Sequence, residues 1–287
     1  MNDHSSLKKN GYEVWNNFLS KNAVDNIVNK VNYFFDKNLN LSIGVNVKAL
    51  KKDELYTYGT ARQEAQKKNK NFFLKQEDFE KGIKFFRNLT SGISINEPLL
   101  NIEEIYAIVT DQNILSFARR YLNQEKIHIG FIKLRRFFCN DLPEFDTNYF
   151  HVDDNCDKIL KCIIYLNDIT DIEDGPFVYV KNSHKNLMPF KEEYVSKYTR
   201  TDEQIKNYYG EDLIVPILAE SGSVLFADTL GYHKGLKSKN KDRYVLYVNY
   251  VVEEEYGGKG LKQKISSNLL QNIKNKELFD FFNIINI

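Results

Sequence analysis

The chain has 287 residues, of which 42% are hydrophobic and 28% charged, and its 40 basic and 39 acidic side chains leave a net charge of +1. These proportions are typical of a soluble globular protein with one large domain. A charge near zero produces no long-range field, so we expect no nucleic-acid partner. No segment has the roughly 20 apolar residues of a membrane helix, and the start lacks a signal-peptide stretch, so we expect no membrane partner. Three cysteines are too few for a disulfide framework, which favours a cytoplasmic location.

The first 126 residues are expected to be mainly helical. One helix begins after Ser20, whose hydroxyl can cap it. Its apolar residues recur at helical spacing: Ala23, Ile27, Val31 and Phe34. Further helices are predicted over residues 77–89 and 111–122, the latter starting at Asp111. Residues 51–75 are polar and rich in lysine, which predicts a loop or a mobile cover.

From residue 127 to residue 252 the sequence changes to short segments rich in Ile, Val, Phe and Tyr, separated by Asp, Asn, Gly and Pro. This pattern predicts successive antiparallel strands, over residues 127–138, 158–168, 175–180, 213–218, 222–228 and 243–252. A polar insertion over 191–212 interrupts them, with a short helix near Thr201. The segment 253–287 holds an amphipathic helix over 267–284. We therefore predict one folding unit over residues 1–287, mainly β with flanking helices, built on an eight-strand jelly roll.

Three residues with metal-binding side chains occur where such a sandwich can bring them together. His151 and Asp153 are two positions apart, so on an extended segment both side chains leave the same face. His233 lies just past the apolar strand 222–228. Two imidazoles and one carboxylate on one face of an octahedron suit non-haem Fe(II) and leave three positions open. A zinc site built from the same residues is chemically possible.

Arg243 lies at the start of the strand predicted over 243–252, ten residues after His233. A guanidinium beside the metal can bind the distal carboxylate of 2-oxoglutarate through two parallel hydrogen bonds. The alternative is an ordinary surface arginine at the start of a strand. A zinc site would leave Arg243 unexplained.

The motifs in this region resemble those of the phytanoyl-CoA dioxygenase family. They are His151-Val152-Asp153, Leu166-Asn167-Asp168, Gly175-Pro176, Ser183-His184-Lys185, and the block Gly222-Ser223, Asp228, His233 and Arg243. The resemblance covers residues 127–252 well and the first forty residues loosely. It implies a double-stranded β-helix of the cupin-like jelly-roll type, with Fe(II) as cofactor and 2-oxoglutarate and O2 as co-substrates. In this resemblance His151, Asp153 and His233 are the metal ligands, and Arg243 anchors the co-substrate.

The sequence departs from the family at one position near the co-substrate. Many members carry Ser or Thr two residues beyond the distal histidine, where this chain has Gly235. The missing hydrogen bond must come from another side chain, and the available candidates are Thr229, Tyr165 and Lys133. Alternation along strand 127–138 does not by itself choose between Lys133 and Arg135.

The activity that the resemblance implies is hydroxylation of a small-molecule metabolite with release of succinate and CO2. The carboxylate of Asp153 argues against halogenation, because halogenases of this kind need that position vacated for a halide. The alternative from another functional class is a non-catalytic, cupin-like or lectin-like jelly roll that binds a small molecule. The sequence leaves the primary substrate and the oligomeric state open.

Overall fold

The computed structural model describes residues 5–37, 84, 87, 88, 91–95, 98–100, 102–142, 144, 146–154, 156–191, 198–256, 259, 260 and 263–272. The predicted cover over 51–75, most of the helix predicted over 77–89 and the end of the helix predicted over 267–284 lie outside these residues.

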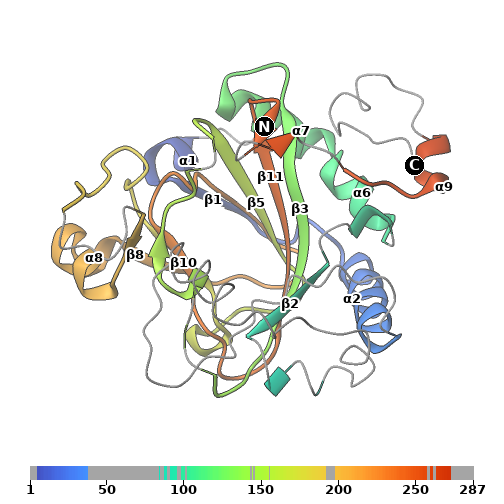
Figure 1. Cartoon of the computed structure of the whole chain (residues 1–287), viewed down its shortest axis with the longest axis horizontal. Coiled ribbons are helices and arrows are strands. Elements are labelled where there is room, and N and C mark those ends of the chain that lie inside the picture. Colours follow the sequence, from blue (N-terminus) through green and yellow to red (C-terminus); the bar gives the residue numbers. More distant parts are fainter. Residues whose placement is uncertain are drawn as a thin grey trace, which may run out of the picture.

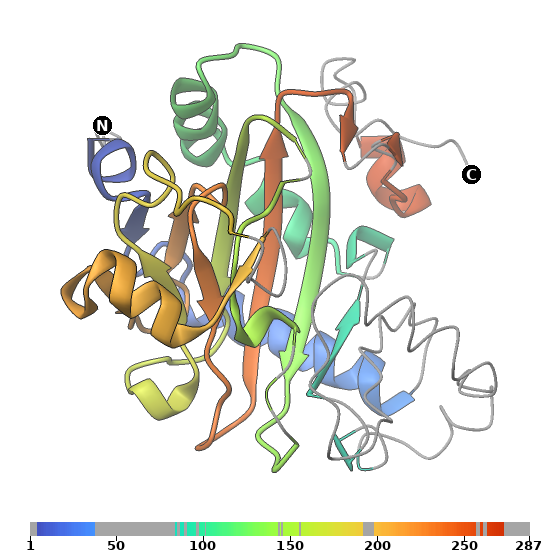
Figure 2. The ribbon, with the colours of Figure 1, turned by 60° about the vertical axis from the view of Figure 1, so that its left-hand side comes forward.

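The larger of the two main sheets has six antiparallel strands in the order β1-β9-β5-β11-β3-β2. Their bounds are Tyr12–Trp15, Val224–Ala227, Ile159–Tyr165, Arg243–Val251, His128–Phe137 and Gly92–Ile95, respectively. The three long strands β5, β11 and β3 run side by side through the middle of the molecule (Figure 2). The edge strands β1 and β2 come from the N-terminal part, which the sequence pattern predicted to be mainly helical. Each has four residues, too few for a periodic pattern to identify.

The smaller sheet has five antiparallel strands in the order β7-β4-β10-β6-β8. Their bounds are Thr199–Arg200, Phe150–His151, His233–Gly235, Phe177–Val180 and Ile214–Ile217. A separate pair joins β12 (Glu255–Tyr256) to β13 (Lys259–Gly260). Apolar side chains from both main sheets meet in one buried cluster, which contains Tyr165 and Val245 of the larger sheet and Phe177 and Ile217 of the smaller one. The two sheets therefore pack as the predicted jelly roll.

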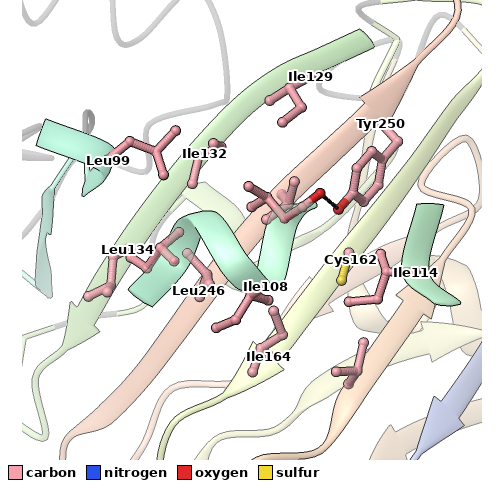
Figure 3. Packing of buried hydrophobic residues seen from close by; sticks show 14 of the residues in the cluster. Leu99, Ile108, Ile114, Ile129, Ile132, Leu134, Cys162, Ile164, Leu246 and Tyr250 are labelled. Carbon is pink, nitrogen blue, oxygen red and sulfur yellow. Dashed lines mark hydrogen bonds between the residues drawn. The ribbon is translucent and has the colours of Figure 1, made fainter. Parts of the chain in front are cut away.

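Side chains along β11 (Arg243–Val251) alternate between two apolar layers, one on each face of the larger sheet. Leu246, Val248 and Tyr250 belong to the cluster beneath the helices, whereas Val245 and Tyr247 face the space between the sheets. Successive side chains of a strand leave opposite faces, so one apolar strand can fill both layers. Figure 3 shows the helix-facing layer, in which the Tyr250 hydroxyl donates a hydrogen bond to the Val109 carbonyl at 3.1 Å.

Three helices supply the other half of that layer: α2 (Lys21–Lys37), α6 (Glu104–Val109) and α7 (Gln112–Leu122). The predicted caps are confirmed. Ser20 Oγ accepts a hydrogen bond from the Ala23 backbone N–H, and the Asp111 carboxylate accepts from the first turn of α7.

The remaining helices among the described residues lie around the sandwich. They are α1 (Ser5–Asn10), α8 (Asp202–Tyr209), α9 (Ser267–Asn272) and the 3-10 turns Pro98–Leu100, Asp146–Asn148, Ile172–Asp174 and Glu211–Leu213. Thr201 caps α8 with the predicted capping box. Figure 1 places α8 and α2 at opposite ends of the molecule. Among the described helices, none has the length and apolar character needed to cross a membrane.

Candidate metal centre

The three candidate ligands come together at neighbouring strands of the smaller sheet. His151 on β4 lies directly opposite His233 on β10, and their ring centroids are 4.3 Å apart. Asp153 follows β4, and its backbone N–H donates to the Thr229 carbonyl at 2.8 Å. The ligand atoms of the three side chains all lie within 4.8 Å of one another. His151 and His233, which are 82 positions apart in sequence, are thus adjacent because β4 and β10 pair antiparallel.

Both imidazoles are held in the same orientation by the backbone. His151 Nδ1 lies 2.9 Å from the Tyr149 carbonyl, and His233 Nδ1 lies 3.0 Å from the Gly231 carbonyl. A carbonyl oxygen only accepts, so each Nδ1 carries the proton and each Nε2 presents a lone pair. The backbone therefore fixes the tautomer that a metal ligand requires.

The charges of the cluster are set by burial and by one neighbouring lysine. Burial lowers the pKa of His233 well below its ordinary value. Burial alone would raise the pKa of Asp153. The Lys161 ammonium outweighs it and holds that pKa below its usual range. The centre therefore presents a neutral imidazole and an ionised carboxylate.

These residues fit a divalent metal ion of the first transition row. His233 Nε2 is buried and has no hydrogen-bond partner in the described part of the chain, and it lies 3.8 Å from Asp153 Oδ2. A buried lone pair without a donor is costly unless another group satisfies it. Two nitrogen ligands and one carboxylate oxygen form the donor set of the Fe(II) facial triad.

Arg243 lies beside this cluster, at the start of β11 in the facing sheet. Its side chain is 2% exposed, and its guanidinium carbon sits 4.3 Å from the centre of the Phe137 ring. A Cβ atom built on Gly235 would stand 3.1 Å from Arg243 Nη2, so the guanidinium lies directly against that glycine. Gly235 follows His233 by two positions and shares its face of β10, a separation of about 7 Å along a strand. A ligand that bridges the two points must therefore be a few carbon atoms long.

The guanidinium of Arg243 has no carboxylate partner within the described residues. No ion pair joins Arg243 to an Asp or Glu of that part of the chain, and its buried Nε makes no hydrogen bond there. A buried positive charge is stable only when an anion compensates it. This arrangement fits a site for one carboxylate of a dicarboxylate.

The three further candidates for co-substrate binding, Tyr165, Thr229 and Lys133, lie in different surroundings. The Tyr165 hydroxyl donates to the Ile217 carbonyl and accepts from the Phe177 N–H, both at 3.0 Å, so it ties the two sheets together. Thr229 is fully buried, its carbonyl supports Asp153, and its hydroxyl oxygen has no hydrogen-bond partner in the described part of the chain. Lys133 pairs across the sheet with Tyr247, whose side chain faces the inner space.

Lys161 is the residue that sequence analysis missed. It lies on β5, where every residue is buried, and its ammonium contacts the Asp153 carboxylate. A single lysine within the apolar segment 159–165 is a visible signal, because a buried ammonium requires a carboxylate partner. The sequence alone does not say which carboxylate that is.

Comparison with solved structures finds chains of the same fold at low sequence identity. HygX from Streptomyces hygroscopicus, solved with nickel and 2-oxoglutarate, aligns with a TM-score of 0.55 and 13% identity, over 92% of this chain and 91% of that chain. The epimerase SnoN, in complex with Fe3+, alpha ketoglutarate and nogalamycin RO, aligns with a TM-score of 0.54 and 14% identity, over 86% and 81%. The carbocyclase SnoK from nogalamycin biosynthesis aligns with a TM-score of 0.54 and 13% identity, over 93% and 88%.

Comparison with curated protein sequences finds no match. The model of the family named phytanoyl-CoA dioxygenase (PhyH) matches residues 7–243. The match includes both histidines and the aspartate of the cluster and ends at Arg243. The chain therefore belongs to the phytanoyl-CoA dioxygenase family of iron- and 2-oxoglutarate-dependent enzymes.

Proposed function

We propose that the protein hydroxylates a small-molecule substrate, with Fe(II) held by His151, Asp153 and His233 and 2-oxoglutarate anchored by Arg243. The observation that carries this proposal is the pairing of a two-histidine, one-carboxylate cluster with a buried guanidinium on the facing sheet that no carboxylate of the described residues compensates. A non-catalytic binding protein would have no need of both features.

When bound, iron and 2-oxoglutarate activate O2 and supply the oxidising power, with release of succinate and CO2. The residues of the chain would bind and orient these groups. The backbone carbonyls at Tyr149 and Gly231 fix the two imidazoles. Arg243, beside the apolar side chains of Phe137 and Phe177, would hold the distal carboxylate among groups that are poorly accessible to water.

Hydroxylation is proposed over halogenation because of one residue. Asp153 occupies the carboxylate position that a halide would need, which argues against halogenation. Two structural neighbours are described as an epimerase and a carbocyclase, so the fold accommodates other outcomes too. A small-molecule substrate is supported by HygX and SnoN, which were solved with hygromycin B and nogalamycin RO respectively.

The experiment is a succinate-release screen against pooled metabolites of the source organism, followed by product analysis under ¹⁸O2. We expect one labelled oxygen in the product and one in succinate. Replacing His151, Asp153 or His233 with Ala should abolish both signals, because each substitution removes a ligand and the open-site geometry. His184→Ala serves as the matched control, since His184 lies outside the cluster and contacts the Lys8 carbonyl.

Succinate formation that survives in Asp153→Ala would contradict the ligand assignment. An oxidised product without ¹⁸O would retain the oxygenase-type site but exclude hydroxylation. Absence of iron-dependent succinate formation across the whole screen would favour the non-catalytic alternative.

A further inference from the structure

Lys161 is a charged residue in a position that otherwise holds apolar side chains. It is 8% exposed and lies on the same face of β5 as Ile163 and Tyr165, which pack in the cluster between the sheets. Its cross-strand neighbours are Ala227 on β9 and Asn249 on β11. None of these neighbours carries a charge that could compensate an ammonium.

The one carboxylate that Lys161 contacts among the described residues is that of Asp153. The Nζ atom donates to Asp153 Oδ2, and the two side chains are only 10% and 16% exposed. The contact spans the sandwich, because Lys161 belongs to the larger sheet and Asp153 follows a strand of the smaller one. Such a pair is scarcely screened by solvent, so each charge depends on the other.

The same carboxylate is the anionic member of the candidate metal cluster. Asp153 Oδ2 lies 3.8 Å from His233 Nε2, so the lysine reaches the edge of the space that a metal ion would occupy. A cation bound there would compensate Asp153 in place of Lys161. The Lys161 ammonium and a bound metal ion would therefore compete for the negative charge of Asp153.

We propose that Lys161 is a positioning residue of the metal centre, which holds the Asp153 carboxylate in the metal-free protein and opposes the binding of a divalent ion. This inference rests on the proposed assignment of Asp153 as a ligand. Removing Lys161 leaves a buried carboxylate uncompensated in the metal-free state, but much less so once a metal ion is bound. By the thermodynamic cycle, its loss should lower the stability of the metal-free protein and tighten metal binding.

A purely structural lysine would behave differently. Its removal would loosen the site, so stability and metal affinity would both fall. Opposite changes in the two quantities are therefore the signature of the proposed role.

The test measures the melting temperature of the metal-free protein and the Kd of nickel(II) alone, both on the full chain. For Lys161→Met we expect a melting temperature lower by about 5 °C or more. We also expect nickel(II) to bind about tenfold more tightly or better. Lys161→Arg should resemble the wild type, since it keeps the charge and the donors. Lys126→Met is the matched control, because Lys126 forms an exposed ion pair with Glu254 and its loss should change neither quantity.

A double-mutant cycle with Asp153→Asn locates the effect. If Lys161 acts through Asp153, Lys161→Met should not lower the melting temperature further once Asp153 is neutral. Lys161→Gln replaces Lys161→Met if the latter does not fold. Additive effects in the cycle, or unchanged nickel(II) affinity in the folded lysine variant, would overturn the inference.

Failure of the underlying ligand assignment would look different. In that case His233→Ala would bind nickel(II) as the wild type does. If His233→Ala abolishes nickel(II) binding but Lys161→Met leaves the Kd of nickel(II) unchanged, the assignment of the metal centre is supported and the proposed role of Lys161 is refuted.

Discussion

Arg243 is the residue whose surroundings say most about the ligand. Its guanidinium is nearly fully buried, stacks on Phe137 and lies against Gly235, yet pairs with no carboxylate of the described chain. Because Gly235 has no side chain, the guanidinium can lie close to β10, two residues from His233. At the position where many family members carry Ser or Thr, this glycine thus leaves room for the Arg243 guanidinium.

Replacing Arg243 with Ala should weaken 2-oxoglutarate binding steeply. Truncating one member of a buried hydrogen-bonded charge pair costs on the order of 2–5 kcal/mol, or roughly thirty- to several-thousand-fold in affinity. Arg243→Lys should recover only part of the loss, because an ammonium keeps the charge but not the two-pronged geometry. The measurement is a titration of succinate formation against 2-oxoglutarate.

Nickel(II) binding without co-substrate should change little in either variant. Arg120→Ala is the matched control, since Arg120 is exposed on α7. A midpoint for 2-oxoglutarate that is unchanged in Arg243→Ala would mean that another residue anchors the co-substrate.

At the scale of elements, Asp242 fastens three segments at the start of β11. Its two carboxylate oxygens accept hydrogen bonds from Arg87 at 2.6 and 2.7 Å, from Arg136 of β3 at 2.8 Å and from the Cys139 N–H at 3.0 Å. Burial alone would raise the pKa of Asp242, but Arg87, the Cys139 N–H and Arg136 outweigh it and lower that pKa. The ionised carboxylate therefore stabilises the fold immediately beside Arg243.

Asp242→Asn should lower the free energy of unfolding at pH 7 by about 1–3 kcal/mol, since hydrogen bonds to a charged acceptor are lost. A carboxyl whose pKa is lower in the folded state contributes stability above its unfolded pKa of about 4 and loses it as the pH falls through the folded value. The difference between wild type and variant should therefore shrink below about pH 4. Denaturant unfolding across the pH range measures it.

The exposed Asp212→Asn variant provides the baseline for that series. If the difference in the free energy of unfolding between wild type and Asp242→Asn stays constant down to low pH, the lost stability comes from packing and not from charge.

At the scale of the whole molecule, the residues of the proposed site come from both sheets. The two histidines lie on strands of the smaller sheet and Asp153 follows one of these strands, whereas Arg243 and Lys161 belong to the larger sheet. A co-substrate held by the metal at one end and by Arg243 at the other would bridge the sandwich. Binding should therefore stabilise the fold as a whole.

We expect 2-oxoglutarate to raise the melting temperature of the nickel(II)-loaded protein by about 5–10 °C at a hundredfold excess over its Kd. Glutarate, which has both carboxylates but no keto oxygen, should give a smaller shift. Arg243→Ala should keep the shift due to nickel(II) and lose most of the shift due to 2-oxoglutarate. Equal shifts with 2-oxoglutarate and glutarate would argue against chelation at the metal.

Local chemistry alone was enough to predict much of this protein. Ser20 and Asp111 mark helix starts because a capping side chain acts within one turn. The alternation and composition of residues 127–252 predict strands. Alternation arises because successive side chains of any one strand leave opposite faces, whatever that strand pairs with. The spacing of His151 and Asp153, with His233 and Arg243 downstream, predicts a metal and co-substrate site through the family resemblance.

The tertiary structure decided which residues meet. The pairing of His151 with His233 depends on the register of β4 and β10, and the contact of Lys161 with Asp153 depends on how two sheets face each other. Gly235 and Arg243 likewise meet only across the sandwich. A sequence pattern records the face from which a side chain leaves its own strand but not the partner it finds there, because that partner is set by long-range pairing and by the burial of charge.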